Sequence, residues 1–341
     1  MRRIALLLPV AGLLALLGVQ AMATTAQAPA PASATKAAPP PATRPAPARA
    51  PSAASSPLDP KAACISNDAA TVVRGCSALI VATGTSGVDK AEAFYRRGNA
   101  RLVLGAPGQA VADFGEAVRL NPKHARALND RGLVFANNGA LDKAIADYNA
   151  AIRIDPRFAL AWNNRGWAYA LLGVFDKAIP DFGQAVSIRP DFTLAYFNRG
   201  LAYYMQGKMV EAIADYDRAL KLVPTYADAL GNRCLARARL RQDLNAALAD
   251  CDAAIKINPK QKVNLGIRAL VHLLRNDLVR ARADSNAALA IDPRLAWPLY
   301  VRSIVKSRLN DAPGASEDLM AARTFEPKIA ERFAPFGLAR K

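Results

Sequence analysis

The sequence predicts an all-α protein: an α-solenoid (superhelix) of about seven stacked helical hairpins. The first observation behind this is a period of 34 residues, with one extra residue in the fifth copy. The copies begin at Ala91, Ala125, Ala159, Thr193, Ala227, Lys262 and Ala296. The second observation is a set of small, aromatic and Pro residues at fixed places in these copies. Such a period is typical of repeat arrays, in which one hairpin buries its apolar face only against its neighbours.

Each copy carries the same pattern of side-chain sizes. A small residue holds one position of the first helix in all seven copies: Gly98, Gly132, Gly166, Gly200, Cys234, Ala269 and Ser303. A position in the second helix is aromatic in four copies and then changes: Phe114, Tyr148, Phe182, Tyr216, Cys251, Ser285 and Leu319. Every copy closes on a Pro: Pro122, Pro156, Pro190, Pro224, Pro259, Pro293 and Pro327. Small residues let two helices approach closely, the aromatic ring fills the seam, and Pro ends the second helix because it lacks an amide proton.

This pattern resembles the tetratricopeptide repeat family over residues 91–327, and Ala161–Pro190 is the copy most similar to it. The resemblance implies a curved array whose first helices line a concave groove for a protein or peptide partner. It implies neither catalysis nor a cofactor. Residues Lys328–Leu338 are predicted to form a final helix that covers the open end of the array.

Composition divides the rest of the chain. Arg2 and Arg3 precede an apolar stretch, Ile4–Val19, and Ala21-Met22-Ala23 fits a signal cleavage site. A cleavable signal peptide predicts a periplasmic or secreted protein of the exported bacterial type, with no integral membrane span in the mature chain; a retained anchor is the alternative. The expected parts are a signal peptide (1–23), a Pro/Ala-rich disordered linker (24–57), an N-terminal helical pair (58–90), the repeats (91–124, 125–158, 159–192, 193–226, 227–261, 262–295 and 296–327), and a capping helix with tail (328–341).

An Arg precedes the small position in every copy, and an Asp precedes the aromatic position. The two are 16 residues apart, or 17 where the fifth copy is longer, and lie equally far from the turn of the hairpin. We therefore interpret them as structural ion pairs; a row of Arg residues for phosphate or RNA is the other interpretation. The predicted pairs include Arg131 with Asp147, Arg165 with Asp181 and Arg199 with Asp215.

The chain has four Cys residues, and export would permit disulfides. Cys234 and Cys251 hold the small and the aromatic positions of one hairpin, so they should face each other across its seam. Cys64 and Cys76 flank a predicted turn at Asn67–Ala69. Two local disulfides are the predicted pairing, with four free thiols as the alternative.

The resemblance to the repeat family places a second set of side chains in the concave groove. An Asn amide both donates and accepts hydrogen bonds, so it can hold the backbone of an extended peptide. Aromatic side chains would anchor such a partner, unless they cover the seams between repeats instead. The candidate partner-binding residues are Asn129, Asn163, Asn164, Trp167, Phe197, Asn198, Tyr204 and Asn232.

Two other classes of function are weighed against a scaffold. The net charge of +17 suggests an anionic partner such as nucleic acid or an acidic envelope polymer, but Asp balances the Arg row and no RNA-binding motif occurs. For an enzyme, the two His residues lack a nucleophile beside them, and the sequence has no phosphate loop or metal-ligand cluster. The sequence therefore favours a non-catalytic scaffold of the cell envelope, and leaves its partner and oligomeric state open.

Overall fold

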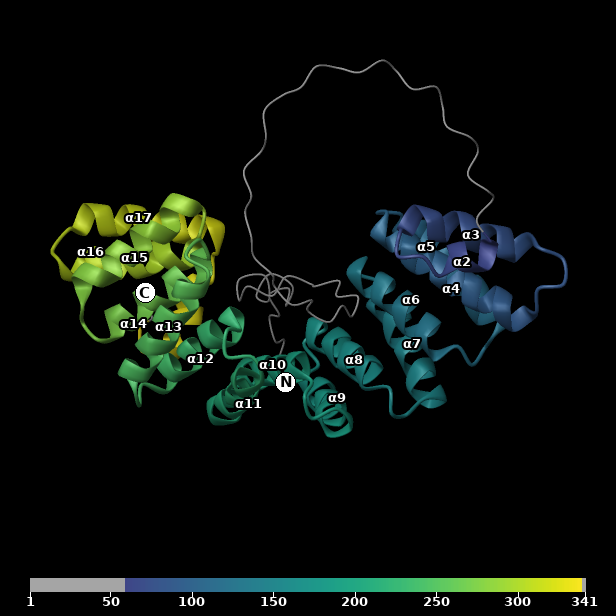
Figure 1. The fold of residues 1–341 in the computed structure, drawn as a ribbon. Helices are drawn as coiled ribbons and strands as arrows, with labels where there is room; N and C mark the ends of the chain where they lie inside the picture. Colours follow the sequence, from purple (N-terminus) through teal and green to yellow (C-terminus); the bar gives the residue numbers. More distant parts are fainter. Residues whose placement is uncertain (1–58, 339–341) are drawn as a thin grey trace, which may run out of the picture. The chain divides into compact units, whose positions relative to one another are not determined.

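The structure, a computed structural model, describes residues 59–338 (Figure 1). The predicted signal peptide (1–23) and the whole of the predicted linker (24–57) lie outside these residues. Within 59–338 every regular element is a helix and no strand occurs, so the predicted all-α fold class is confirmed. The chain divides into two compact units, and the division falls inside α6 (Ala125–Asn137), between Arg131 and Gly132.

The described part of the first unit begins with a short helical pair. The pair consists of α2 (Pro60–Cys64) and α3 (Ala69–Val81). The hairpin of the first repeat follows, with α4 (Gly87–Val103) and α5 (Pro107–Leu120). Asp68 begins α3, because its carboxylate accepts a hydrogen bond from the amide of Thr71 at 2.7 Å. In the same way Ser86 caps α4, so this helix begins four residues before the predicted start of the first repeat at Ala91.

The second unit is a run of hairpins. Its complete first helices are α8 (Ala159–Leu171), α10 (Thr193–Met205), α12 (Ala227–Leu240), α14 (Lys262–Leu274) and α16 (Ala296–Arg308). Its second helices are α7 (Leu141–Ile154), α9 (Phe175–Ile188), α11 (Met209–Leu222), α13 (Leu244–Ile257), α15 (Leu278–Ile291) and α17 (Ala312–Phe325). Helices α9, α11, α13 and α15 each pack against their own first helix and the next one, and neighbouring first helices from α8 to α16 also touch. The first helices thus form one continuous layer, which we call the inner layer.

Turns within the hairpins use residues that tolerate a left-handed backbone. Gly173 and Gly207 end first helices with φ values of 74° and 82°. Asn276 and Asn310 do the same in the last two hairpins, since Asn accepts this conformation more readily than most residues. The fifth repeat departs from this rule, because Arg241 ends α12 at φ 56°.

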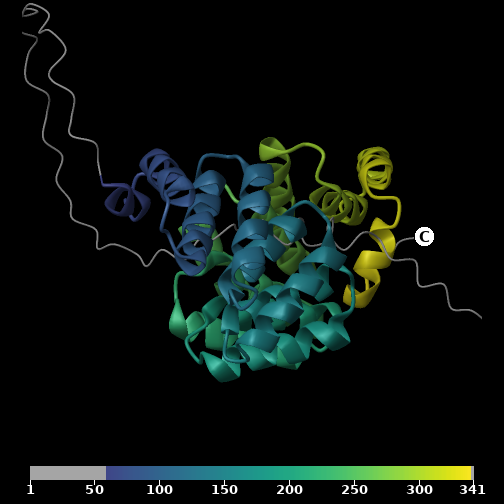
Figure 2. The same ribbon diagram turned by 90° about the vertical axis from the view of Figure 1, so that its right-hand side faces the viewer.

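The chain ends differently from the single capping helix that the sequence predicts. The end of the described chain forms α18 (Ile329–Phe333) and then a 3-10 turn, η1 (Ala334–Phe336). Pro335 explains the change: it has no amide proton, and its ring would collide with the carbonyl of Glu331 in a continued α-helix. In Figure 2 this segment, in yellow, turns back from the last hairpin.

Candidate partner-binding surface

The Arg and Asp rows meet as paired side chains inside the hairpins. Arg165 donates from Nε and Nη2 to the two carboxylate oxygens of Asp181, both at 2.7 Å. Arg199 makes the same two-bond contact with Asp215 at 2.6 and 2.7 Å. Both carboxylates are buried. The hydrogen bonds to these carboxylates raise the pKa of the Arg165 and Arg199 guanidinium groups. These charges are therefore neutralised within the protein and do not face a ligand.

We call the Arg residues that precede the small position of each copy the ladder Arg residues. Their third nitrogen joins neighbouring hairpins, a contact that the repeat pattern alone did not lead us to predict. Arg165 Nη1 donates to Asn149 of the preceding second helix at 2.6 Å. Three later Arg residues do the same, with Asp217 for Arg233, Asp252 for Arg268 and Asn286 for Arg302. Each acceptor lies two residues after an Asp of the row and 16 residues before its Arg. The constant spacing was a signal that could have revealed this contact.

A second cation joins the buried Asp in several repeats. Four residues after the ladder Arg, Arg101 contacts Asp113 at 2.7 Å and Arg237 contacts Asp250 at 2.7 Å. Lys306 occupies the same place in the last repeat, 3.1 Å from the carboxylate of Asp318. These additional basic side chains are therefore also neutralised by pairs inside the protein.

The small and aromatic positions face each other across the seam of each hairpin. A Cβ added at Gly166 would lie 2.9 Å from a ring carbon of Phe182, and one at Gly200 would lie 2.8 Å from the ring of Tyr216. Both rings are fully buried. Gly is required at these positions because the ring occupies the space that a larger residue would need.

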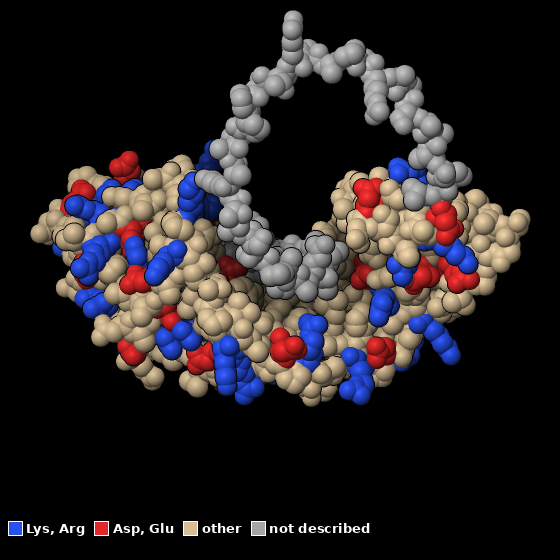
Figure 3. Space-filling model, viewed as in Figure 1, with Lys and Arg blue, Asp and Glu red and all other residues tan. Residues whose placement is uncertain are grey.

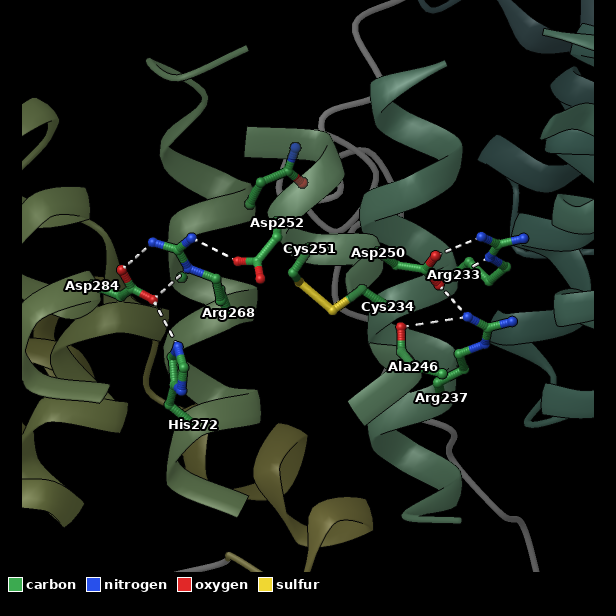
Figure 4. Close-up of a disulfide and its surroundings, with 12 residues drawn as sticks. Arg233, Cys234, Arg237, Ala246, Asp250, Cys251, Asp252, Arg268, His272 and Asp284 are labelled. Carbon is green, nitrogen blue, oxygen red and sulfur yellow. Dashed lines mark hydrogen bonds and ion pairs between the residues drawn. A yellow bond between two sulfur atoms is a disulfide. The ribbon is translucent and has the colours of Figure 1, made fainter. Parts of the chain in front are cut away.

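In the fifth repeat a disulfide replaces this packing (Figure 4). Cys234 of α12 and Cys251 of α13 are joined, with Cα atoms 5.6 Å apart and both side chains fully buried. Cys64 and Cys76 form the second disulfide, between α2 and α3, with Cα atoms 4.6 Å apart. Both disulfides have the predicted local pairing, and no cysteine within residues 59–338 is free.

The candidate Asn residues lie mostly between repeats. Asn129, Asn163, Asn198 and Asn232 are at most 5% exposed, and only Asn164 of this set is partly exposed. Asn198 donates to Asn163 Oδ1 at 3.0 Å, which links α10 to α8. The structure thus places four of the five amides where a partner would not reach them without movement. Their role in binding stays a prediction.

The three candidate aromatic residues divide into two environments. Phe197 is 2% exposed and its ring packs against Tyr226 and Tyr216, with centroids 5.0 and 6.0 Å away. It therefore covers a seam between repeats. Trp167 and Tyr204 are partly exposed on α8 and α10, at the edge of the largest apolar cluster of the second unit. Burial raises the pKa of Tyr204, and the nearby guanidinium groups of Arg239 and Arg332 oppose that rise.

An apolar pocket opens on the inner layer near this cluster. Three consecutive first helices and the C-terminal segment line it, with Leu235 from α12, Ile267 from α14, Trp297 and Pro298 from α16, and Arg332 from α18. Trp297 is fixed by its indole nitrogen, which donates to the carbonyl of Gly266 at 3.2 Å. The sequence indicates a place in the groove for Leu235 but not for Trp297, Pro298 or Arg332, because the pocket exists only where three hairpins and the segment meet.

In the part of the chain that the structure describes, no three His, Cys, Asp or Glu side chains gather in a group that could hold a metal ion. None of the helices in residues 59–338 is both long and apolar enough to cross a membrane. An array of helical hairpins with an inner layer and an apolar pocket is the architecture of a binding scaffold.

Comparison with known proteins agrees with this class. Family models described as tetratricopeptide repeat match residues 95–157 and 193–226, and one described as TPR repeat matches residues 168–207. The chain therefore contains tetratricopeptide repeats over residues 95–157 and 168–226, and such repeats typically mediate protein–protein interactions. No curated protein matches the sequence.

Solved structures show the same fold at low sequence identity. A tetratricopeptide repeat protein from Parabacteroides merdae is 19% identical with a TM-score of 0.57, over 73% of this chain and 98% of that one. PilW, a type IV pilus biogenesis factor, is 23% identical with a TM-score of 0.53, over 62% and 96%. The Cut9–Hcn1 hetero-tetramer is 14% identical with a TM-score of 0.57, over 80% of this chain and 59% of that one.

Proposed function

We propose that this protein is a non-catalytic scaffold of the cell envelope, which binds a peptide segment or a partner protein on its inner layer of first helices. The observation that carries the proposal is the pocket between α12, α14 and α16, whose lining is largely apolar. The partly exposed Trp167 and Tyr204 extend this surface toward α8 and α10. Aromatic side chains at the centre of an interface provide much of its binding free energy.

Two features support an envelope location. Residues 1–23 have the composition of an export signal. The two disulfides favour an oxidising compartment, because thiols in the cytosol are kept reduced. The proposed domain organisation is unchanged: a signal peptide, a Pro/Ala-rich spacer, a short helical pair, seven repeats and a terminal segment.

Capture from the protein's own envelope fraction tests the proposed surface. The protein, with its first 23 residues removed, is cross-linked to the fraction as wild type and as the double variant Trp167→Ala/Tyr204→Ala. We expect the double variant to recover the partner at least several-fold less. Val210→Ala is the matched control, because Val210 lies on the second helix α11 and is 67% exposed. Equal recovery by wild type and double variant would place the binding surface elsewhere.

Binding of an anionic polymer is the second candidate, suggested by the net charge of +17. The internal pairing of the Arg row disfavours it, and on the face shown in Figure 3 Lys and Arg lie among Asp and Glu. The ionic strength separates the two candidates. Binding through phosphate contacts weakens steeply between about 50 and 200 mM salt, whereas docking into an apolar pocket does not.

A further inference from the structure

The C-terminal segment, residues 326–338, lies on the inner layer and not only on the end of the array. Ile329 and Phe333 are fully buried, and Phe336 is 2% exposed. Helix α18 contacts α16, whereas η1 contacts α12, which belongs to a hairpin two repeats earlier. A segment that reaches from α16 to α12 must cross the surface that the first helices form between them.

Aromatic rings hold the segment in place. The ring centroid of Phe333 lies 4.4 Å from that of Trp297 and 4.5 Å from that of Tyr300. Phe336 meets Trp297 edge-on at 5.9 Å. The hydroxyl of Tyr300 donates to the carbonyl of Leu338 at 3.1 Å, which fixes the end of the segment. Two rings three residues apart are thus the anchors, and one backbone carbonyl supplies the polar contact.

The segment has little structure of its own to hold it there. Helix α18 has five residues, far fewer than an isolated helix needs to be stable in water. Its Arg332 pairs with Glu326 of the same segment at 2.8 Å. The hairpins beneath it have their own ion pairs and seam packing, with Arg268 bound to Asp284 and Arg302 bound to Asp318. These ion pairs do not involve the segment, so they are independent of whether it is bound.

The apolar surface continues beyond the segment. The pocket that Arg332 lines is also lined by Leu235, Val263 and Ile267 of the inner layer. A partner side chain that contacts these residues would therefore lie next to the bound segment.

We propose that residues 326–338 are an intramolecular ligand of the inner layer, and that the partner bound at α12, α14 and α16 carries the same chemistry. That partner is a short peptide turn with two aromatic rings three residues apart, followed by an apolar residue. This inference rests on the proposed function and specifies its partner. The partner can bind only those molecules whose segment has been released. The apparent affinity for the partner is therefore the intrinsic affinity multiplied by the fraction of molecules in that released state.

A labelled synthetic peptide of residues 326–338 tests the exchange by fluorescence anisotropy on the full-length protein. We expect the double variant Phe333→Ala/Phe336→Ala to bind the peptide at least ten-fold more tightly than wild type does. Adding Trp297→Ala should abolish that gain. Phe325→Ala is the matched control and should bind as wild type, because Phe325 lies on α17 and is 47% exposed. Equal affinity of wild type and double variant, or no effect of Trp297→Ala, would overturn the proposal.

Hydrogen exchange on wild type gives a second measurement that needs no substitution. If the segment opens while the hairpins stay folded, the amides of residues 329–338 exchange at least ten-fold faster than those of α14 and α16. Equal protection would show that the segment is an integral part of the fold and would overturn the proposal. The capture experiment with Trp167 and Tyr204 does not depend on the segment, so the proposed function and this inference can fail separately.

Discussion

Gly183 marks a missing contact between two hairpins, and replacing it should stabilise the protein. Arg165 and Arg302 each donate a third hydrogen bond to an Asn of the preceding second helix, at 2.6 and 2.8 Å. The equivalent position before Arg199 is Gly183, in the middle of α9. A Cβ built there lies 3.7 Å from Arg199 Nη1, so an added side chain meets ordinary contact distances. The substitution Gly183→Asn supplies the absent acceptor.

The expected gain has two parts. Asn is more favourable than Gly in a helix interior by about 0.3–0.5 kcal/mol. A hydrogen bond to the guanidinium, whose side chain is 16% exposed, should add about 1 kcal/mol. The sum of about 1.5 kcal/mol corresponds to a rise in melting temperature of about 3–6 °C for a unit of this size.

Urea and thermal unfolding followed by circular dichroism measure this gain. Gly183→Val is the matched control, since Val has nearly the same helix propensity as Asn but cannot accept a hydrogen bond. We expect Gly183→Asn to exceed Gly183→Val by about 1 kcal/mol. If the two variants are equally stable, the contact between ladder Arg and preceding helix contributes nothing, and the reasoning is refuted.

Three further predictions concern single positions in the second unit. Pro180 is exposed inside α9 where five of the other six copies have Ala, so Pro180→Ala should raise the free energy of unfolding by up to about 3 kcal/mol in urea melts; an unchanged midpoint would contradict this. Tyr216 is fully buried and its hydroxyl has no hydrogen-bond partner, so Tyr216→Phe should stabilise the protein by about 1 kcal/mol, and a loss of stability would reveal a partner. Burial lowers the pKa of His272 below its ordinary 6.5 despite nearby Asp carboxylates. The unfolded chain therefore binds more protons below pH 6.5, and stability should fall as the pH drops through 6.5; melts of His272→Gln at pH 7.5 and 5 should show a smaller loss than wild type.

The repeated pattern was enough to predict the hairpins, because helical packing within one repeat is local. A Gly opposite an aromatic residue 16 positions later has one arrangement in which the two fit, and the pairs Gly166–Phe182 and Gly200–Tyr216 adopt it. The same local geometry brings Cys234 and Cys251 together. Turn, helix ends and seam all depend on residues within one copy of 34.

Contacts between copies depended on the tertiary structure. The Asn residues chosen for the groove are buried because adjacent first helices close over them, as the bond from Asn198 to Asn163 shows. The sequence of one repeat does not contain the distance to the next helix, so exposure could not be deduced from it.

The sequence by itself determined that this chain forms helical hairpins, which of its charges are paired within a hairpin, and which cysteines meet. Each of these follows from side-chain size and spacing along a helix. Only the tertiary structure decided where the last residues lie, because Phe333 and Phe336 find Trp297 and Tyr300 across hairpins that are distant in sequence. A pocket built from three first helices and the terminal segment exists only after the repeats have stacked.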